Sequence, residues 1–237
     1  MTPALETRGL VKRFGGLTAL WGVDLAARPG EVLGIIGVNG AGKTTLMNCI
    51  CGLYRVDDGD VFIAGERVTG LPPHAIAHRG VGRTFQVPRV FRRISLIDNL
   101  LVPVLGNPAS DRELLRRAEA MLDSMRLLEL RHNHAEELSG GQQKLLEIAR
   151  MLMPDPKVVM LDEPFAGVHP VLCRFMIEQI EAMASAGKTV LLISHDLTSI
   201  YRLSHRVVAL NEGSIIAEGG VDDIRGNPAV IEAYLGT

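Results

Sequence analysis

Residues 37–44 have the sequence GVNGAGKT, a glycine-rich loop of the kind that binds a nucleoside triphosphate. Because glycine has no Cβ, the backbone amides of such a loop can curl around phosphate groups. Lys43 supplies a positive charge for the β and γ phosphates, and the Thr44 hydroxyl is suited to coordinate Mg²⁺. The loop lies between a strand pattern at 31–37 and a helix pattern at 44–51, whose positive end would face the anion. We therefore expect the nucleotide to contact Gly37, Asn39, Gly40, Ala41, Gly42, Lys43, Thr44 and Thr45.

Two adjacent acids, Asp162 and Glu163, follow the apolar run at 157–161. If this run is a strand of a parallel sheet, its carboxyl end lies at the edge where nucleotide sites of α/β folds form. Asp162 is then placed to hold Mg²⁺ through water. A pair of solvated acids ahead of Pro164 is the alternative, but the phosphate loop favours the nucleotide site.

Residues 138–143 have the sequence LSGGQQ, far downstream of the phosphate loop. With both motifs, the chain resembles the ATP-binding cassette ATPases, whose LSGGQ segment contacts ATP held by a different subunit. The start of the predicted helix at 142–151 offers the Ser139 hydroxyl and the Gly141 amide as an anion site. The resemblance implies that Ser139, Gly140, Gly141 and Gln142 bind the ATP of a partner cassette. Charge stabilisation donated in trans is worth roughly 10³ to 10⁵ in rate in other phosphate-loop enzymes, so the chain alone is expected to be a weak ATPase.

The same resemblance implies roles for residues outside these motifs. Glu163 takes the position of the general base that polarises the attacking water. His195, after the strand pattern at 188–194, corresponds to the histidine that touches the γ phosphate. Gln86, in the sequence RTFQ, corresponds to the glutamine that reaches Mg²⁺ and the attacking water. Phe14 matches the aromatic residue that stacks on adenine, with Trp21, the single tryptophan of the chain, as a rival.

One position departs from the family pattern. After Glu163 and Pro164 the family commonly has an aspartate that crosses between the two ATP sites, and His169 stands there in this chain. Because a histidine side chain can gain a proton near neutral pH, communication between the sites could depend on protonation.

The elements that must position these residues alternate between apolar strands and helical patterns, which indicates an α/β fold. The resemblance implies a P-loop NTPase core, a mostly parallel sheet with helices on both faces, plus an antiparallel β subdomain and an inserted helical subdomain. We expect a single domain over residues 1–237. Its predicted parts are antiparallel β at 5–30 and 59–70, the core at 31–58, 71–87 and 154–237, and the helical part at 88–153.

The charge, the apolar runs and the cysteine content of the chain indicate which partners and which cellular compartment to expect. The 25 Lys and Arg residues against 27 Asp and Glu residues leave a net charge of -2, which argues against nucleic acid as a partner. No apolar run approaches the roughly 18 residues of a membrane span, and the first residues lack the layout of a secretory signal. Three cysteines without disulfide spacing fit a reducing compartment. We expect a peripheral protein at the cytoplasmic face of the inner membrane.

The segment from Gln86 to Asn99 mixes arginines with apolar residues and suits a partner surface. In the family this surface receives a short helix from the integral-membrane permease. An ordinary helix with a solvated basic face is the alternative.

The whole chain is most similar to the ATP-binding subunits of branched-chain amino-acid importers. The similarity rests on four strings: RFGGLTAL at 13–20, GVGRTFQ at 80–86, LIDNLL at 96–101 and NPAVIEAYLG at 227–236. It implies two permeases, a second and paralogous ATP-binding subunit, and a substrate-binding protein as indirect partner. The alternatives are ATPases of urea or other amide importers, of a lipopolysaccharide-export complex, or a non-transport cassette protein. A catalytically silent regulatory subunit is a further alternative, but Lys43, Asp162, Glu163 and His195 are all present, which argues against it.

Overall fold

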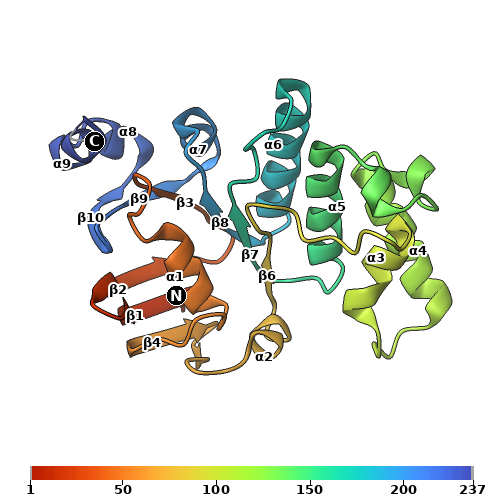
Figure 1. The fold of residues 1–237 in the computed structure, drawn as a ribbon, viewed down its shortest axis with the longest axis horizontal. Helices are drawn as coiled ribbons and strands as arrows, with labels where there is room; N and C mark the ends of the chain where they lie inside the picture. The colour runs from red at the N-terminus through yellow and green to blue at the C-terminus, as the bar shows by residue number, and fades with distance from the viewer. Residues whose placement is uncertain (1, 236–237) are drawn as a thin grey trace.

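The computed structural model describes residues 2–235, and within this range the strands form two sheets (Figure 1). The first sheet has the order β2-β1-β4-β5 and is antiparallel. In the second sheet, of order β10-β9-β3-β8-β7-β6, the neighbours from β9 to β6 are parallel and β10 is antiparallel to β9. The strands are β1 (Leu5–Phe14), β2 (Leu17–Ala27), β3 (Val32–Ile36), β4 (Asp58–Ile63), β5 (Glu66–Arg67), β6 (Val81–Arg83), β7 (Val158–Asp162), β8 (Thr189–Ile193), β9 (Arg206–Asn211) and β10 (Ser214–Gly219).

The helices connect these strands and cover both faces of the parallel sheet. They are α1 (Lys43–Ile50), α2 (Pro73–Ala77), α3 (Leu96–Leu101), α4 (Asp111–Ser124), α5 (Gly140–Leu152), α6 (Pro170–Ser185), α7 (Leu197–Leu203), α8 (Val221–Arg225) and α9 (Pro228–Leu235), with short 3₁₀ turns at Val102–Val104, Leu128–Leu130 and Ala135–Glu137. This arrangement confirms the predicted α/β fold with a mostly parallel sheet and an antiparallel β part.

Two hydrophobic cores lie on opposite faces of the parallel sheet because successive side chains of a strand point to opposite sides. On β3, Leu33 and Ile35 belong to the core that α1 shares with the antiparallel sheet. Val32 and Ile36 belong to the other core, which takes in α6, α7 and the helical region. The helix that follows the phosphate loop is therefore held between the two sheets, and the loop at its start is fixed from both sides.

The helices α3, α4 and α5 gather at one end of the molecule, away from the antiparallel sheet (Figure 1). The alternative interpretation that 86–99 forms one ordinary helix is wrong, because α3 begins only at Leu96, with Ser95 as its N-cap. Pro88 disfavours helical geometry before it. The Asn99 amide bonds the main-chain N–H and C=O of Phe91 at 2.9 and 3.0 Å, which holds the preceding segment in an irregular conformation.

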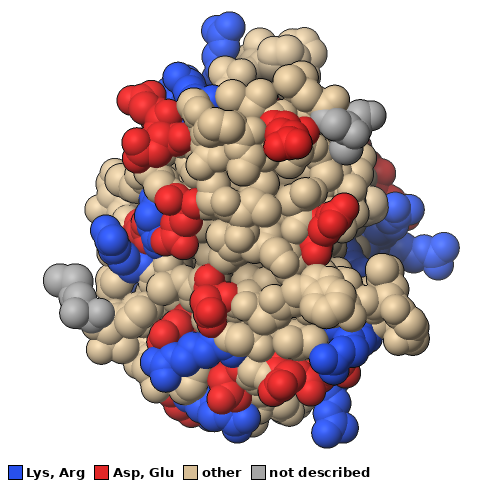
Figure 2. Space-filling view, turned by 90° about the vertical axis from the view of Figure 1, so that its left-hand side faces the viewer, with Lys and Arg blue, Asp and Glu red and all other residues tan. Residues whose placement is uncertain are grey.

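The face shown in Figure 2 mixes acidic and basic side chains without a region of one sign. Among the helices of the described range, none combines the length and the apolar character needed to cross a bilayer.

Candidate functional site

The phosphate loop after β3 depends on glycine for its shape. A Cβ on Gly37, whose φ is 152°, would lie 2.3 Å from the carbonyl oxygen of Leu210. Gly42 has a φ of 103°, and a Cβ there would lie 2.8 Å from the carbonyl oxygen of Ala19. Larger residues at these two positions would push β9 or β2 away from the loop.

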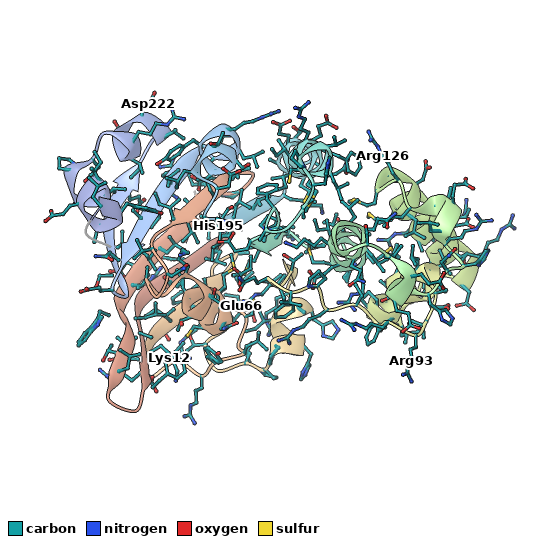
Figure 3. The ribbon with its side chains drawn as sticks, turned by 45° about the horizontal axis from the view of Figure 1, so that its top comes forward. Lys12, Glu66, Arg93, Arg126, His195 and Asp222 are labelled. Carbon is teal, nitrogen blue, oxygen red and sulfur yellow. The ribbon has the colours of Figure 1, made fainter. Side chains whose placement is uncertain are left out.

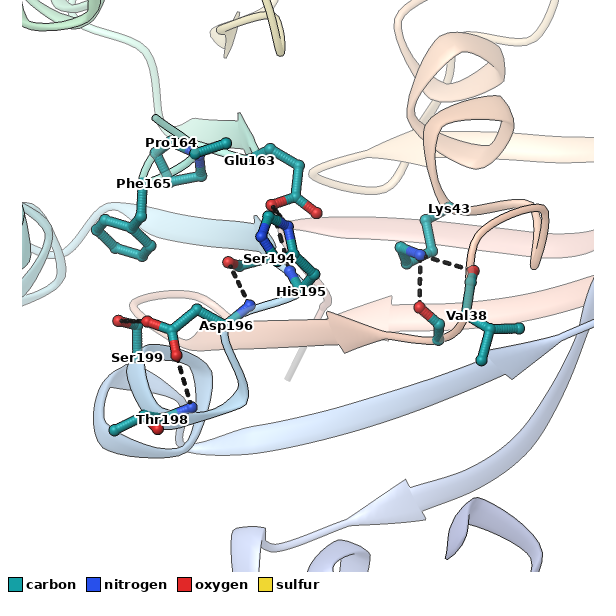
Figure 4. Close-up of polar contacts among 12 residues, drawn as sticks. Val38, Lys43, Glu163, Pro164, Phe165, Ser194, His195, Asp196, Thr198 and Ser199 are labelled. Carbon is teal, nitrogen blue, oxygen red and sulfur yellow. Dashed lines mark hydrogen bonds and ion pairs between the residues drawn. The ribbon is translucent and has the colours of Figure 1, made fainter. Parts of the chain in front are cut away.

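Lys43 closes back over this loop. Its Nζ donates hydrogen bonds to the carbonyl oxygens of Gly37 at 2.6 Å and Val38 at 2.9 Å (Figure 4). Burial lowers the pKa of Lys43, while the carboxylates of Glu163 and Asp162 act in the opposite direction. The ammonium group therefore lies within the electrostatic reach of both acids.

The other loop residues predicted to contact nucleotide surround Lys43. The helix α1 begins at Lys43, one residue earlier than the sequence pattern indicated. Asn39, Gly40 and Thr44 are exposed, Thr45 is half-buried and Ala41 is buried. The exposed side of the loop is thus open to a ligand.

Asp162 is the last residue of β7 and is buried. Its Oδ2 lies 3.3 Å from Nη2 of Arg83, whose Nη1 donates to Oδ1 of Asn48 on α1 at 2.7 Å. Burial raises the pKa of Asp162, and Arg83 counteracts that rise. Arg83 therefore joins α1, β6 and β7 beneath the loop.

Glu163 follows with a left-handed backbone, φ 50°, which is unusual for a residue with a side chain. Its main-chain N–H donates to the carbonyl oxygen of Ile193 on β8 at 2.9 Å. Its Oε2 lies 2.7 Å from Nδ1 of His195 and accepts a hydrogen bond from the His195 N–H at 3.2 Å (Figure 4). The two residues that the sequence assigned to water activation and to the γ phosphate are in direct contact.

His195 is exposed, and Figure 3 shows it near the middle of the molecule. A pocket of about 390 Å³ brings Thr44, Gln86 and Asp162 together, and Arg83 and Asn48 also line it. The hydroxyl, amide and carboxylate oxygens of the first three are hard donors, which fit Mg²⁺. Among residues 2–235, no group of three or more His, Cys, Asp or Glu side chains could hold a metal ion. Because Mg²⁺ usually keeps phosphate and water ligands, the residues present fit the ion.

Phe14, at the end of β1, is half exposed, and its ring meets the Tyr54 ring edge-on at 5.3 Å. Lys12 lies over the same ring, with Nζ 5.1 Å from its centre. The rival Trp21 is also exposed, and its main-chain N–H bonds the Gly213 carbonyl oxygen at 2.9 Å. Both aromatic rings remain accessible for stacking, so the adenine position stays a prediction.

The LSGGQQ motif forms the beginning of α5. Ser139 is the N-cap, and its hydroxyl accepts from the Gln142 N–H at 3.4 Å, while the Gln142 side-chain oxygen accepts from the Ser139 N–H at 3.0 Å. Ser139 and Gly140 are exposed, and a Cβ on Gly141 would lie 2.5 Å from Leu172 on α6. The glycine allows the start of α5 to lie close to α6.

His169 lies outside the buried site. It is the exposed N-cap of α6, and its Nδ1 accepts a hydrogen bond from the Val171 N–H at 3.3 Å. The imidazole therefore takes the capping role that an aspartate side chain also performs.

Sequence reasoning missed several residues that organise this site. Arg83 contacts Asp162, and Asn48 accepts a hydrogen bond from Arg83. Lys144 and Glu147 on α5 are buried and bond the main chain on either side of the site. The Tyr234 hydroxyl on α9 accepts from the Gly37 N–H at 2.8 Å. The polar residue types alone gave no signal, since Lys144 and Glu147 resemble solvated residues of any amphipathic helix.

Comparisons with known sequences agree with this geometry. The sequence model of the family described as "ABC transporter" matches residues 20–166. A second model, "Branched-chain amino acid ATP-binding cassette transporter", matches residues 214–237, the region that contains β10, α8 and α9.

Curated relatives match over nearly the full length. The chain is 41% identical to BraF of Pseudomonas aeruginosa, a high-affinity branched-chain amino acid transport ATP-binding protein, over 99% of this chain and 98% of that protein. It is 40% identical to LivG of Escherichia coli K12, which has the same description, with the same two coverages.

A solved structure shares the fold. The ADP conformation of MJ1267, an ATP-binding cassette of an ABC transporter, is 34% identical, with a TM-score of 0.90 over 100% of both chains. The phosphate loop, the acids at the end of β7 and the LSGGQQ motif are thus set in a fold shared with a known cassette. This chain is an ABC transporter ATPase and belongs to the branched-chain amino acid transporter (LivG/BraF) family of ATP-binding proteins.

Proposed function

We propose that this chain powers an importer of branched-chain amino acids, using Glu163 as the base for ATP hydrolysis. The single observation that carries the hydrolytic part is the contact between Glu163 and His195 beside Asp162 and Lys43. These residues come from two adjacent parallel strands and from the start of α1.

Lys43 binds the β and γ phosphates of ATP. Its ammonium group now donates to two carbonyl oxygens of its own loop. Phosphate oxygens are stronger acceptors than neutral carbonyls, so they compete for the same donors when ATP arrives. The loop amides and the start of α1 supply further positive potential.

Glu163 removes a proton from the attacking water. Its carboxylate is mostly buried and is oriented by the main-chain N–H and the ring of His195. With the proton on Nδ1, the His195 ring donates to Glu163 and leaves Nε2 for another partner. Glu163 therefore activates water in a fixed position relative to His195, which contacts the γ phosphate.

Thr44, Gln86 and Asp162 would hold Mg²⁺, which when bound would neutralise the developing phosphate charge. Arg83 and Asn48 keep the Asp162 carboxylate at the end of β7. The exposed side chain of Phe14 stacks on the adenine ring.

Hydrolysis requires two cassettes. ABC ATPase subunits dimerise and associate with permeases. The exposed start of α5 is available to bind ATP that is held by another subunit. Ser139, Gly140, Gly141 and Gln142 form that second half-site. The other cassette is a paralogue, and closure of the pair over ATP moves the membrane subunits.

The permease docks on the surface from Gln86 to Asn99. Val87 is 72% exposed and Phe91 is 47% exposed, and Arg92 and Arg93 are also exposed. This combination suits a short helix with apolar and acidic side chains. The chain is therefore peripheral, at the cytoplasmic face of the membrane, and it contacts the substrate-binding protein only through the permeases.

Branched-chain amino acids as cargo are supported by the names of the relatives and by the family model at residues 214–237. Since the cargo does not touch this subunit, the test must use the whole complex. The tagged chain is purified with its permeases, placed in liposomes and supplied with the complex's binding protein.

We expect uptake and ATPase stimulation by leucine, isoleucine or valine. Stimulation by urea or an amide alone would replace this cargo with that of an amide importer. Extraction of lipopolysaccharide without amino-acid uptake would assign the chain to an export complex.

A further inference from the structure

Lys144 is a buried lysine on the helix that begins with the LSGGQQ motif, and its side chain points toward the segment after β7. It is 7% exposed. Its Nζ donates to three carbonyl oxygens, those of Glu163 at 2.8 Å, Pro164 at 3.2 Å and Ala166 at 2.7 Å. An ammonium group has three donors, so each has a main-chain partner.

These hydrogen bonds fall on a strained piece of backbone. Glu163 has a φ of 50°, a conformation that L-residues with a side chain rarely adopt. Its position before Pro164 restricts its backbone further. Such geometry persists only where the surroundings hold it in place.

The Glu163 peptide units are held from two sides. On one side, the N–H of Glu163 bonds the Ile193 carbonyl oxygen of β8 at 2.9 Å. On the other side, the carbonyl group turns toward α5, where Lys144 is its donor. Between these two anchors, the side chain is directed at His195 (Figure 4).

Burial lowers the pKa of Lys144, while Glu163 and Glu147 oppose that effect. An isolated buried ammonium group would be costly, and the three hydrogen bonds to carbonyl oxygens offset that cost.

We propose that Lys144 is a positioning residue for hydrolysis: it fixes the main chain of Glu163 and thereby connects the helix of the LSGGQQ motif to the carboxylate of the same cassette. The inference rests on the proposed role of Glu163 as base. Because Lys144 follows Ser139 by five residues on the same rigid helix, a shift of α5 on binding the partner's ATP reaches Glu163 directly.

The test replaces Lys144 by Met, which keeps the length of the side chain and removes its donors. In the purified transporter complex, we expect Lys144→Met to lower kcat on the order of 10- to 100-fold, the range caused by small misplacements of a catalytic group. The dissociation constant for ATP should stay within about twofold of the wild type. Lys144→Arg, which keeps charge and donors, should recover part of kcat.

Lys188→Met is the matched control. Lys188 also donates to a main-chain carbonyl oxygen, that of Pro156 at 3.0 Å, but near the opposite end of β7. The Lys188→Met variant should have the kcat of the wild type. A kcat of Lys144→Met within twofold of the control would overturn the inference, and so would an equal loss of kcat and ATP affinity.

Two further measurements keep the result decisive. If Lys144→Met does not fold, Lys144→Gln, which cannot donate to all three carbonyl oxygens, is measured in its place, and a wild-type kcat in that folded variant would overturn the inference. In a Glu163→Gln background, Lys144→Met should cause no additional loss of the residual rate, whereas a full additional loss would contradict the coupling. An active Glu163→Gln variant would refute the base assignment itself, independently of Lys144.

Discussion

The Oε2 atom of Glu163 lies 2.7 Å from Nδ1 of His195, and the same oxygen accepts a hydrogen bond from the His195 N–H. This contact joins the ends of β7 and β8, where Asp162 and Ile193 are partners in the parallel register. A carboxylate fixed by both the ring and the main chain of its neighbour has little freedom to turn away from a reacting water.

Replacing Arg83 should shift the pH dependence of ATP hydrolysis. Burial raises the pKa of Asp162, and the Arg83 guanidinium counteracts this rise. In Arg83→Met the Asp162 pKa should rise further, so the carboxyl group stays protonated to a higher pH and binds Mg²⁺ less well there. We expect the acidic limb of the ATPase pH profile to move to higher pH.

The matched control is Arg79→Met, because Arg79 is a surface arginine that pairs with Glu66 at 2.8 Å. Its pH profile should match that of the wild type. An unchanged acidic limb in Arg83→Met would show that Arg83 does not set the charge of Asp162.

Removing the His169 side chain should destabilise the start of α6. The His169 Nδ1 accepts a hydrogen bond from the Val171 N–H. His169→Asn keeps a side-chain acceptor at this position, whereas His169→Ala does not. Because the loss of an N-cap costs about 1 kcal/mol, His169→Ala should have a free energy of unfolding lower than that of His169→Asn by about this amount. Equal stability of the two variants in denaturant unfolding would mean that the side chain does not cap α6.

Removing the Tyr234 hydroxyl should destabilise the phosphate loop. In Tyr234→Phe the buried Gly37 N–H loses its acceptor, which should lower the free energy of unfolding by about 1 to 3 kcal/mol. Denaturant unfolding of the nucleotide-free protein measures this loss. Tyr201→Phe is the control, since its ring, 4.5 Å from the Arg225 guanidinium carbon, keeps that contact. Equal stability of the two variants would mean that the hydroxyl does not hold the loop.

The sequence predicts much of the fold because local patterns determine it. The glycine-rich loop requires a strand before it and a helix after it, and β3 and α1 occupy those places. The apolar run before Asp162 is a fully buried strand, as expected for a parallel sheet between helices. The conformation of the segment at 87–95 could not be predicted, because it depends on hydrogen bonds with the nearby Asn99 side chain and with Glu147, which is far away in the sequence.

The site itself was predictable only where a motif marks it. Lys43, Glu163 and His195 stand in recognisable strings, whereas Glu147 does not. Its carboxylate accepts from the N–H of Arg89 at 2.8 Å and of Phe85 at 3.4 Å, on either side of Gln86. These contacts join residues about 60 positions apart, and no local pattern specifies them. Glu147 therefore acquires its role only through tertiary packing, which brings α5 next to the segment around Gln86.

The Glu163→Gln variant tests the central claim most directly. The amide keeps the size of the side chain and its contact with His195 but cannot take a proton from water. In single-turnover measurements on the purified transporter complex, ATP should bind with wild-type affinity and be hydrolysed roughly 10² to 10⁴ times more slowly, with the cassettes held as a closed dimer. Hydrolysis of bound ATP at the wild-type rate would contradict the assignment of Glu163 as the base.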